Sequence, residues 1–250
     1  MNVTWAIARR ELWGLFSTPL AWVLLAVTQG LSAWLFLVLV EDFQRLEPRL
    51  SPLENAPGVT DLVVAPLLQG AAWLLLVTAP LLTMTAIGGE RRDGTLVLLT
   101  TAPLSPATVV TGKYLGALGF VLLLATPAGA MSLALLMGAP IALGRLATGW
   151  GGLVLLGAAA AAVGLWTSTL FAQPAAAAGA ALGILVFTVF AEGAATPEES
   201  RALLVYLSPL GHFRPLLQGL VTAADLGYFL GVIAGFWGLS ALRLAGEGLR

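Results

Sequence analysis

Residues Gly88–Tyr114 read GGERRDGTLVLLTTAPLSPATVVTGKY and separate two long apolar stretches of the chain. They hold five charged side chains, in a protein where only 10% of residues are charged: Glu90, Arg91, Arg92, Asp93 and Lys113. The stretches on either side, Leu62–Gly89 and Tyr114–Gly144, carry no charge. A helix needs roughly 20 apolar residues to cross a bilayer core, so each stretch is long enough for a span. We therefore expect the segment to connect two membrane helices.

The rest of the chain repeats this pattern and predicts an all-α polytopic membrane protein. It is 58% hydrophobic, whereas soluble domains average about half apolar and a quarter charged residues. The longest charge-free run, Leu146–Ala191, exceeds one span, and we expect Gln173-Pro174 to divide it because proline readily ends a helix. Residues 1–250 are thus predicted to form one transmembrane domain with six spans, near 20–40, 62–87, 114–138, 147–172, 175–191 and 226–242.

The residue types that catalysis and metal binding require are scarce. The chain has no cysteine and one histidine, so it offers no thiolate site and no zinc-type cluster. Its Gly112-Lys113 pair precedes Tyr114, where a phosphate-binding loop needs Ser or Thr, and Ala107 stands where the first glycine belongs. We therefore expect that the chain does not hydrolyse ATP, is not an enzyme, and has no catalytic residue, metal site or cofactor.

Four titratable residues raise the question of a role in binding or ion coupling. His212, beside Phe213, is interpreted as a structural residue at the membrane interface, with a ligand or proton-relay role as the alternative. Asp61, Glu192 and Asp225 fall near the ends of predicted spans, where water is available. This position favours a structural role over the ion coupling that an acid inside the membrane would indicate.

The charge distribution predicts the orientation. Six spans place both termini on one side of the membrane, together with Gly88–Lys113. That side carries seven basic residues and a net charge of +3, whereas the other carries five and a net charge of −4. Because cytoplasmic loops are enriched in Lys and Arg, we expect a multi-pass protein of the bacterial cytoplasmic (inner) membrane, with both termini in the cytoplasm.

The residues before the first span, Asn2–Phe16, predict an amphipathic helix. Its apolar residues recur at helical spacing: Trp5, Ile7, Ala8, Leu12 and Leu15. Charged residues cluster opposite: Arg9, Arg10 and Glu11. Tryptophan with arginine suits a helix in the headgroup layer, and the predicted interfacial residues are Trp5, Arg9, Arg10 and Trp13. The alternative is a helical extension of the first span, although Ser17-Thr18-Pro19 predicts a break before it.

Two polar segments are predicted on the outer side. Glu41–Thr60, with three prolines, is expected to form an external loop, with a short helix as an alternative for part of it. Glu192–Leu220 is expected to contain a re-entrant or interfacial pair of short helices before the last span, because Pro209, Gly211 and Pro215 interrupt an otherwise apolar stretch.

Three glycine pairs stand four residues apart, a spacing that permits close helix approach: Gly112/Gly116, Gly179/Gly183 and Gly231/Gly235. Packing within the chain and dimerisation explain these pairs equally well.

The segment Gly89–Ala117 resembles the one that follows the second span in ABC-2-type transporter permeases. The family pattern is Glu, a basic residue and then Gly-Thr-Leu with further leucines, a small residue before proline, and Gly-Lys-aromatic entering the next span. The matching residues are Glu90, Arg91, Gly94, Thr95, Leu96, Leu98, Leu99, Pro103, Gly112, Lys113 and Tyr114. Two further stretches, Glu11–Val23 and Tyr206–Trp237, are similar to the gliding-motility-type branch of this family.

The resemblance implies a permease subunit of an ATP-driven exporter. Its N-terminal helix would be interfacial, and a cytoplasmic coupling helix, Glu90–Leu99, would rest on a separate ATPase subunit. The implied coupling residues are Glu90, Arg91, Arg92, Gly94, Thr95, Leu96, Leu98 and Leu99. Charged residues there can pair at the rim of a groove on the ATPase, which the leucines can fill.

The expected partners follow from the same resemblance. They are a dimer of ABC ATPase subunits, a second permease copy or a homologous permease, membrane lipid and an extracytoplasmic auxiliary subunit, and no nucleic acid is expected. The alternative function is a non-transporting membrane anchor or scaffold for an ATPase-driven machine at the cell surface.

Overall fold

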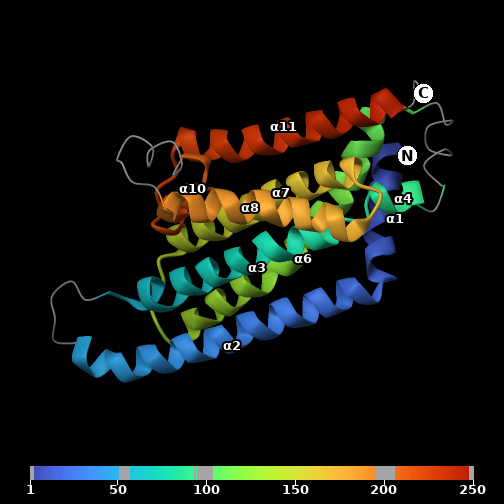
Figure 1. The fold of residues 1–250 in the computed structure, drawn as a ribbon. Coiled ribbons are helices and arrows are strands. Elements are labelled where there is room, and N and C mark those ends of the chain that lie inside the picture. The colour runs from blue at the N-terminus through green and yellow to red at the C-terminus, as the bar shows by residue number, and fades with distance from the viewer. Residues whose placement is uncertain (1–2, 51–56, 93, 95–103, 195–205, 248–250) are drawn as a thin grey trace.

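The computed structural model is a bundle of long helices, and it describes residues 3–50, 57–92, 94, 104–194 and 206–247 (Figure 1). Every regular element within these ranges is a helix, which confirms the all-α prediction. The long helices are α2 (Pro19–Leu50), α3 (Ala65–Thr83), α6 (Pro106–Ala134), α7 (Leu143–Leu170), α8 (Pro174–Ala194) and α11 (Ala223–Glu247). The short ones are α1 (Val3–Phe16), η1 (Thr60–Val64), α4 (Gly88–Arg92), η2 (Leu135–Met137) and α10 (Pro209–Leu217).

Five helical stretches of the described chain are long and apolar enough to cross a membrane. They are Pro19–Arg49, Thr60–Arg92, Pro106–Met137, Leu143–Leu170 and Ala223–Gly246. The apolar part of α8, Pro174–Phe190, is shorter than these five. The structure thus has five candidate spans, whereas the sequence predicts six, and α8 is the element on which the difference rests.

α7 lies at the centre of the bundle. In the most apolar stretch of α7, 78% is buried inside the bundle, whereas only 17% of the corresponding stretches of α2 and α11 is buried. α3, α6, α8, α10 and α11 pack against α7, while α2 lies along the opposite edge of the bundle from α11 (Figure 1). Small residues permit this central position, because the run 158–162 is all buried alanine and a Cβ at Gly164 would lie 2.9 Å from the Cα of Pro80.

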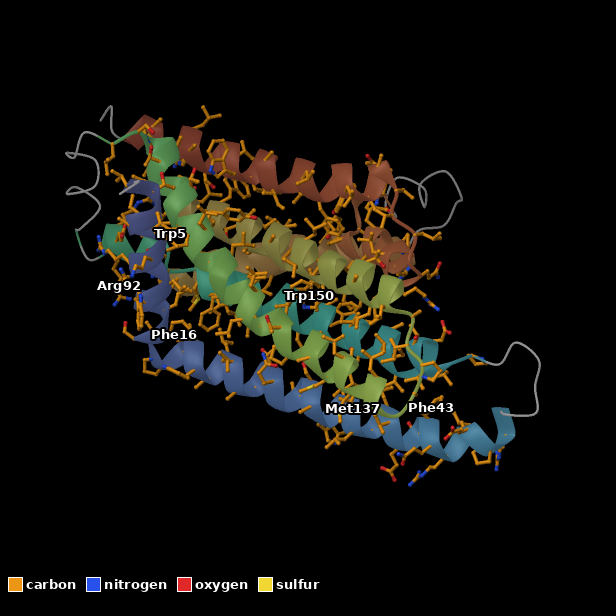
Figure 2. All side chains as sticks on the ribbon, turned by 180° about the vertical axis from the view of Figure 1, so that it is seen from behind. Trp5, Phe16, Phe43, Arg92, Met137 and Trp150 are labelled. Atoms are coloured by element: carbon orange, nitrogen blue, oxygen red, sulfur yellow. The ribbon has the colours of Figure 1, made fainter. Side chains whose placement is uncertain are left out.

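The bundle has two ends that carry different polar elements (Figure 1). One end, called the α4 end here, holds α1, α4, the start of α6 and the last turns of α11. The other, called the α10 end, holds the last turns of α2, η1, the start of α7 and α10. α1 runs crosswise to the long helices, with Trp5 and Phe16 near its two ends (Figure 2).

Two helix breaks that prolines predict are confirmed. α1 ends at Phe16 and α2 begins at Pro19. The hydroxyl groups between them donate to carbonyl oxygens of the last turn of α1, from Ser17 to Gly14 at 2.6 Å and from Thr18 to Leu15 at 2.7 Å. They therefore complete the end of α1 and do not cap α2. Similarly, α7 ends at Leu170 and α8 begins at Pro174.

The predicted external loop Glu41–Thr60 is wrong in its first half, because α2 continues as a helix to Leu50. No glycine or proline interrupts the chain between Gly30 and Pro48, and Glu41 pairs with Arg45 one turn later. At 1.5 Å per residue α2 is about 48 Å long, so its charged last turns extend beyond a bilayer core of about 30 Å. Residues 51–56 lie outside the described part of the chain.

α10 stands in the described part of the segment for which two short helices are predicted, and Tyr206 and Leu207 before it are helical as well. Ser208 caps it by accepting a hydrogen bond from the backbone N–H of Gly211 at 3.3 Å, and Pro209 is its first residue. Gly219, with φ of 85°, follows its last turn in the left-handed conformation that glycine tolerates. The remainder of the predicted pair, residues 195–205, lies outside the described residues.

Candidate functional site

α4 follows α3 after a tight turn and is anchored to the end of α7. The backbone N–H groups of Ile87 and Gly88 both donate to the hydroxyl oxygen of Ser168, at 2.8 and 3.1 Å. All three residues are buried. An unpaired buried N–H costs about 1–3 kcal/mol, so Ser168 fixes the first turn of α4 against α7.

Two further features bring α4 close to the C-terminal end of α7. A Cβ at Gly88 would lie 2.6 Å from the carbonyl oxygen of Phe171, a contact that only glycine avoids. Nη2 of Arg91 donates to the carbonyl oxygen of Thr169 at 2.9 Å. A guanidinium is favourable there because the last carbonyl groups of a helix carry the negative end of its dipole.

Lys113 forms the centre of a buried ionic cluster that joins α1, α4 and α6. Its Nζ donates to Oε2 of Glu11 at 3.1 Å and to Oε1 of Glu90 at 2.9 Å. Lys113 is only 2% exposed, so these two carboxylates offset the cost of burying its charge. We call Glu11, Glu90 and Lys113 the Lys113 cluster.

α1 lies directly on α6 because α6 has glycine where the two helices cross. A Cβ at Gly112 would lie 2.6 Å from the Cβ of Ile7, and one at Gly116 would lie 2.9 Å from the carbonyl oxygen of Ala8. The Gly112/Gly116 pair therefore serves packing within the chain, one of the two explanations that the spacing allows. The other two pairs, Gly179/Gly183 and Gly231/Gly235, have no heavy atom of a described residue within 4 Å of their Cβ positions beyond the local helix.

The outer face of α1 combines aromatic and basic side chains. Trp5 and Trp13 are 63% and 64% exposed, and Arg9 and Arg10 are exposed beside them. Among the residues of the predicted apolar face Trp5 is exposed, while Ala8 is the buried residue of the helix. The predicted polar face is corrected for Glu11, which turns inward because Lys113 binds it.

The predicted coupling residues are described only in part. Glu90 and Arg91 are partly buried against α6 and α7, whereas Arg92 and Gly94 are exposed. Arg92 lies beside α1 at the α4 end (Figure 2). Gly94 has φ of 71°, so the chain leaves α4 through a conformation that a residue with a side chain seldom adopts. The other four lie outside the described residues: Thr95, Leu96, Leu98 and Leu99.

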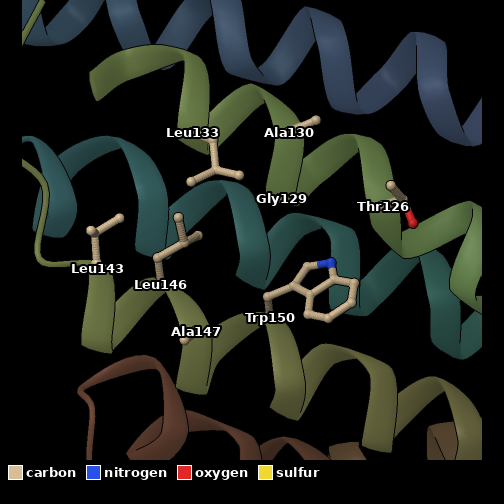
Figure 3. Close-up of a pocket in the computed structure, with 8 residues that line it drawn as sticks. All are labelled: Thr126, Gly129, Ala130, Leu133, Leu143, Leu146, Ala147 and Trp150. Carbon is tan, nitrogen blue, oxygen red and sulfur yellow. The ribbon is translucent and has the colours of Figure 1, made fainter. Parts of the chain in front are cut away.

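An apolar pocket of about 450 Å³ lies between α6 and α7, in their halves nearer the α10 end (Figure 3). Its walls include Leu133, Leu146 and Trp150. The two polar groups among its lining side chains are already bonded, since Nε1 of Trp150 donates to the carbonyl oxygen of Ala125 and the Thr126 hydroxyl donates to that of Leu122. The pocket therefore presents hydrocarbon surface, and it has no part in the Lys113 cluster.

Three residues of the site are absent from the predicted site residues: Glu11, Lys113 and Ser168. Glu11 lies 102 positions from Lys113, and Ser168 lies 80 positions from Gly88. The one signal in the sequence is the lone lysine of an apolar chain, which has to find an acidic partner when it is buried.

Comparison with known proteins gives two findings. A family model described as "ABC-2 family transporter protein" matches residues 5–249. A protein of Pseudomonas aeruginosa described as "Probable ABC transporter permease protein NosY" is 36% identical over 136 residues, which cover 52% of this chain. The matched part is 43% of that relative, so the similarity spans less than half of its length.

Proposed function

Because the chain belongs to the ABC-2 family of transporter proteins, we propose that it is the membrane-spanning permease subunit of an ATP-binding-cassette exporter. In this proposal a separate ATPase subunit hydrolyses ATP, and the chain, which is itself no enzyme, couples hydrolysis to the export of a substrate. The family match over residues 5–249 and the five candidate spans support it.

The observation that carries the coupling role is the attachment of α4 to three other helices at once. α4 bonds to α7 through Ser168 and Thr169, and Lys113 joins it to α6 and α1. A five-residue helix is not stable alone, so α4 keeps its place through these contacts. A force on α4 is therefore delivered to α1, α6 and α7 together.

The start of α6 passes that force further into the bundle. The Tyr114 hydroxyl donates to the carbonyl oxygen of Ala158 in α7 at 3.1 Å. Nε1 of Trp237 in α11 donates to Oγ1 of Thr111 at 3.1 Å. Residues on both sides of Lys113 are thus bonded to neighbouring helices. A shift of the Lys113 cluster therefore moves α7 and α11 as well.

The surface proposed to receive the ATPase is the exposed side of the α4 end. Arg92 and Gly94 belong to it, and Glu90 and Arg91 fix it to the bundle. The coupling helix would continue through four residues beyond the described ones: Thr95, Leu96, Leu98 and Leu99. Charge-assisted contacts at a rim and leucines in a groove are the usual division of such an interface.

The proposed orientation places the α4 end in the cytoplasm of a bacterial inner-membrane protein. α8 counts as the sixth span in this proposal, which returns both termini to the cytoplasmic side. The crosswise position of α1, with Trp5, Trp13, Arg9 and Arg10 outward, supports its role as an interfacial helix. The positive charge predicted for this side supports the same orientation.

The proposed partners are a dimer of ATPase subunits, a second permease, membrane lipid and an extracytoplasmic auxiliary subunit. α2 and α11 leave broad apolar faces in the described protomer, as protein or lipid neighbours require. We also propose membership of the gliding-motility-type branch, on the sequence of Glu11–Val23 and Tyr206–Trp237.

The test is purification of the full chain from its native membrane with and without a charge reversal at the proposed surface. Wild-type protein is expected to bring an ATP-binding-cassette ATPase with it, and the complex is expected to hydrolyse ATP. Arg92→Glu is expected to reduce both ATPase recovery and hydrolysis, because it reverses an exposed charge at the end of α4. Arg45→Glu, the same change at the exposed α10 end, serves as the matched control and should alter neither.

Two results would contradict the proposal. Equal ATPase recovery with Arg92→Glu and Arg45→Glu would remove α4 from the interface. An ATPase complex that moves no substrate after reconstitution into vesicles, across a panel of native membrane and periplasmic extracts, would leave only the scaffold function.

A further inference from the structure

A second buried cluster of titratable groups lies at the α10 end, between α10 and the first turn of α11. His212 and Asp225 are 7% and 5% exposed, and Nδ1 of His212 lies 2.8 Å from Oδ1 of Asp225. This burial corrects the expectation that Asp225 meets water at a span end. Tyr206, His212, Thr222, Asp225 and Tyr228 are called the His212 cluster here.

Bonds between two residues of the local sequence orient Asp225. Thr222 and Asp225 make a reciprocal cap at the start of α11, in which the Thr222 hydroxyl donates to Oδ2 of Asp225 at 2.7 Å. The backbone N–H of Asp225 donates to the same hydroxyl oxygen at 3.1 Å. The bond from the Asp225 N–H is the one that an N-cap threonine accepts at a helix N-terminus. The bond to Oδ2 leaves Oδ1 turned towards His212.

Both ring nitrogens of His212 face oxygen acceptors. Nε2 lies 2.9 Å from the carbonyl oxygen of Tyr206, which cannot donate, and Nδ1 faces the Asp225 carboxylate. A neutral imidazole has one N–H and therefore satisfies only one of these acceptors. The doubly protonated ring satisfies both and also neutralises the buried carboxylate.

The Tyr228 ring also suits a charged imidazole. The His212 ring stacks on Tyr228 with centroids 4.2 Å apart, and the Tyr206 ring stands nearly perpendicular to it with centroids 5.1 Å apart. The negative face of an aromatic ring attracts a cation. The Tyr228 hydroxyl is occupied elsewhere, since it donates to the carbonyl oxygen of Leu207 at 2.8 Å.

We propose that His212 and Asp225 form a proton-binding site, and that the bound proton holds Tyr206, α10 and the start of α11 together. When the proton leaves Nδ1 for water, a lone pair faces the Asp225 carboxylate across 2.8 Å. If the remaining proton moves to Nδ1, Nε2 faces the Tyr206 carbonyl instead. Either way one buried acceptor loses its donor, so α10 separates from α11 as the pH rises.

His212 and Asp225 form the centre of the site, and the other titratable groups near them come from the elements packed around α10. From α11 the ring meets Asp225 and Tyr228, and from the segment before α10 it meets Tyr206. α10 itself adds Arg214, which is exposed. Among the elements packed on α10, α3 has no titratable residue, α8 has Glu192, and α7 has Arg145, which pairs with Asp61 of η1 at 2.7 Å.

This site differs from the proposed coupling site in place and in chemistry. It lies at the opposite end of the bundle from the Lys113 cluster, and only its exposure to the outside of the cell rests on the proposed orientation. A proton-dependent clamp there would make the position of α10 depend on the pH of the compartment into which the substrate is released.

The first test is nuclear magnetic resonance of the full chain in lipid nanodiscs, with ¹⁵N-labelled histidine and an affinity tag free of histidine. The chain has one histidine, so the signal comes from His212 alone. From about pH 5 to about pH 9, the range around ordinary histidine titration, we expect two protonated ring nitrogens at the acidic end and one at the alkaline end. A neutral ring throughout this range would overturn the proposal, and so would a ring that stays doubly protonated.

The second test links the proton to movement through the labelling rate of a single introduced cysteine, which the cysteine-free chain permits. Ser208→Cys places a thiol at a buried position beside the cluster, and exposed Val221→Cys corrects for the pH dependence of the reagent. The ratio of the two rates is expected to rise about tenfold or more with pH, the effect of one unmade buried hydrogen bond. An unchanged ratio would overturn the clamp.

Asp225→Asn is the variant that separates the proton from the packing. An amide can donate to Nδ1 and still accept from Thr222, so a neutral His212 satisfies every contact. The labelling ratio of Ser208→Cys should then stay low at all pH values. A pH-dependent rise that persists in Asp225→Asn would contradict the proposal. Both tests use the permease without an ATPase, so their failure would leave the proposed export function standing, and a missing ATPase would leave the proton site standing.

Discussion

The two ends of the bundle each bury one ionic cluster, and the two clusters connect the chain over different distances. At the α4 end, Lys113 binds Glu11 and Glu90, which are 102 and 23 positions away. At the α10 end, His212 binds Asp225, which is 13 positions away. Lys113 lies between two carboxylates, whereas both ring nitrogens of His212 face acceptors, so the contacts of His212 depend on the proton proposed above.

This difference separates a permanent connection from a conditional one. The Lys113 cluster unites three helices from separate parts of the chain, as a part that transmits force requires. The His212 cluster joins neighbouring segments through a proton that water can remove. The α4 end should therefore be the more rigid of the two, and substitutions there should destabilise the protein more than substitutions at the α10 end.

Lys113→Met is expected to cause the largest loss of stability. It leaves Glu11 and Glu90 facing each other without the cation between them, and removing one partner of a buried ionic group costs about 3–5 kcal/mol. The thermal unfolding midpoint of the purified chain should fall, and a cysteine at buried Ala8 should become accessible to maleimide as α1 leaves α6. Arg45→Met, which breaks an exposed pair, is the control and should change little. Protection of Ala8→Cys in the Lys113→Met background would show that packing alone holds α1.

Ser168→Ala tests the anchor of α4 without touching a charge. The backbone N–H groups of Ile87 and Gly88 lose their shared acceptor, and we expect a loss of about 1–3 kcal/mol. Hydrogen exchange of the peptide around α4 should accelerate. Ser240→Ala is the matched control, because Ser240 is equally buried but bonds only to the carbonyl oxygen of Phe236 in its own helix. Similar exchange in both variants would contradict the anchoring role.

The long helices follow from the sequence because each depends on a local property, a charge-free apolar run that ends at proline or glycine. α7, α8 and the break at Pro174 are examples. The end of α2 does not follow from the sequence, because its charged residues favour a loop although Glu41 and Arg45 support a helix equally well. Polarity shows where a helix leaves the membrane and does not show where the helix ends.

The partners within each cluster depend on distances in space that no local pattern encodes. Gly112 and Gly116 show that some helix approaches α6, yet nothing in their spacing names α1. Glu11 looks like one of three charged residues on an outer face until Lys113 draws it inward. His212 and Asp225 are close in sequence, but the fold of α10 against α11 is what brings the ring and the carboxylate together.

Gly116→Ala tests the approach of α1 to α6 by adding one methyl group. The new Cβ would lie 2.7 Å from the Cβ of Glu11 and 2.9 Å from the carbonyl oxygen of Ala8, so α1 has to shift. Such overpacking costs about 1–3 kcal/mol, and the unfolding midpoint should fall accordingly. Gly231→Ala makes the same change where no described atom lies within 4 Å, and the gain in helix propensity should leave it at least as stable as wild type. Equal losses in the two variants would mean that Gly231 meets a partner in the intact assembly.

Asp61→Asn at the α10 end is expected to have the smallest effect. Asp61 pairs with Arg145 over a separation of 84 positions, which lies between the 23 and 102 positions of the bonds in the Lys113 cluster. Its side chains are 42% and 30% exposed, however, and exposed ion pairs contribute about 0–1 kcal/mol. The unfolding midpoint should change little, and high salt should reduce what difference there is between variant and wild type. A loss as large as that of Lys113→Met would show that sequence separation, and not burial, decides the strength of these connections, and the contrast between the two ends would then have to be drawn differently.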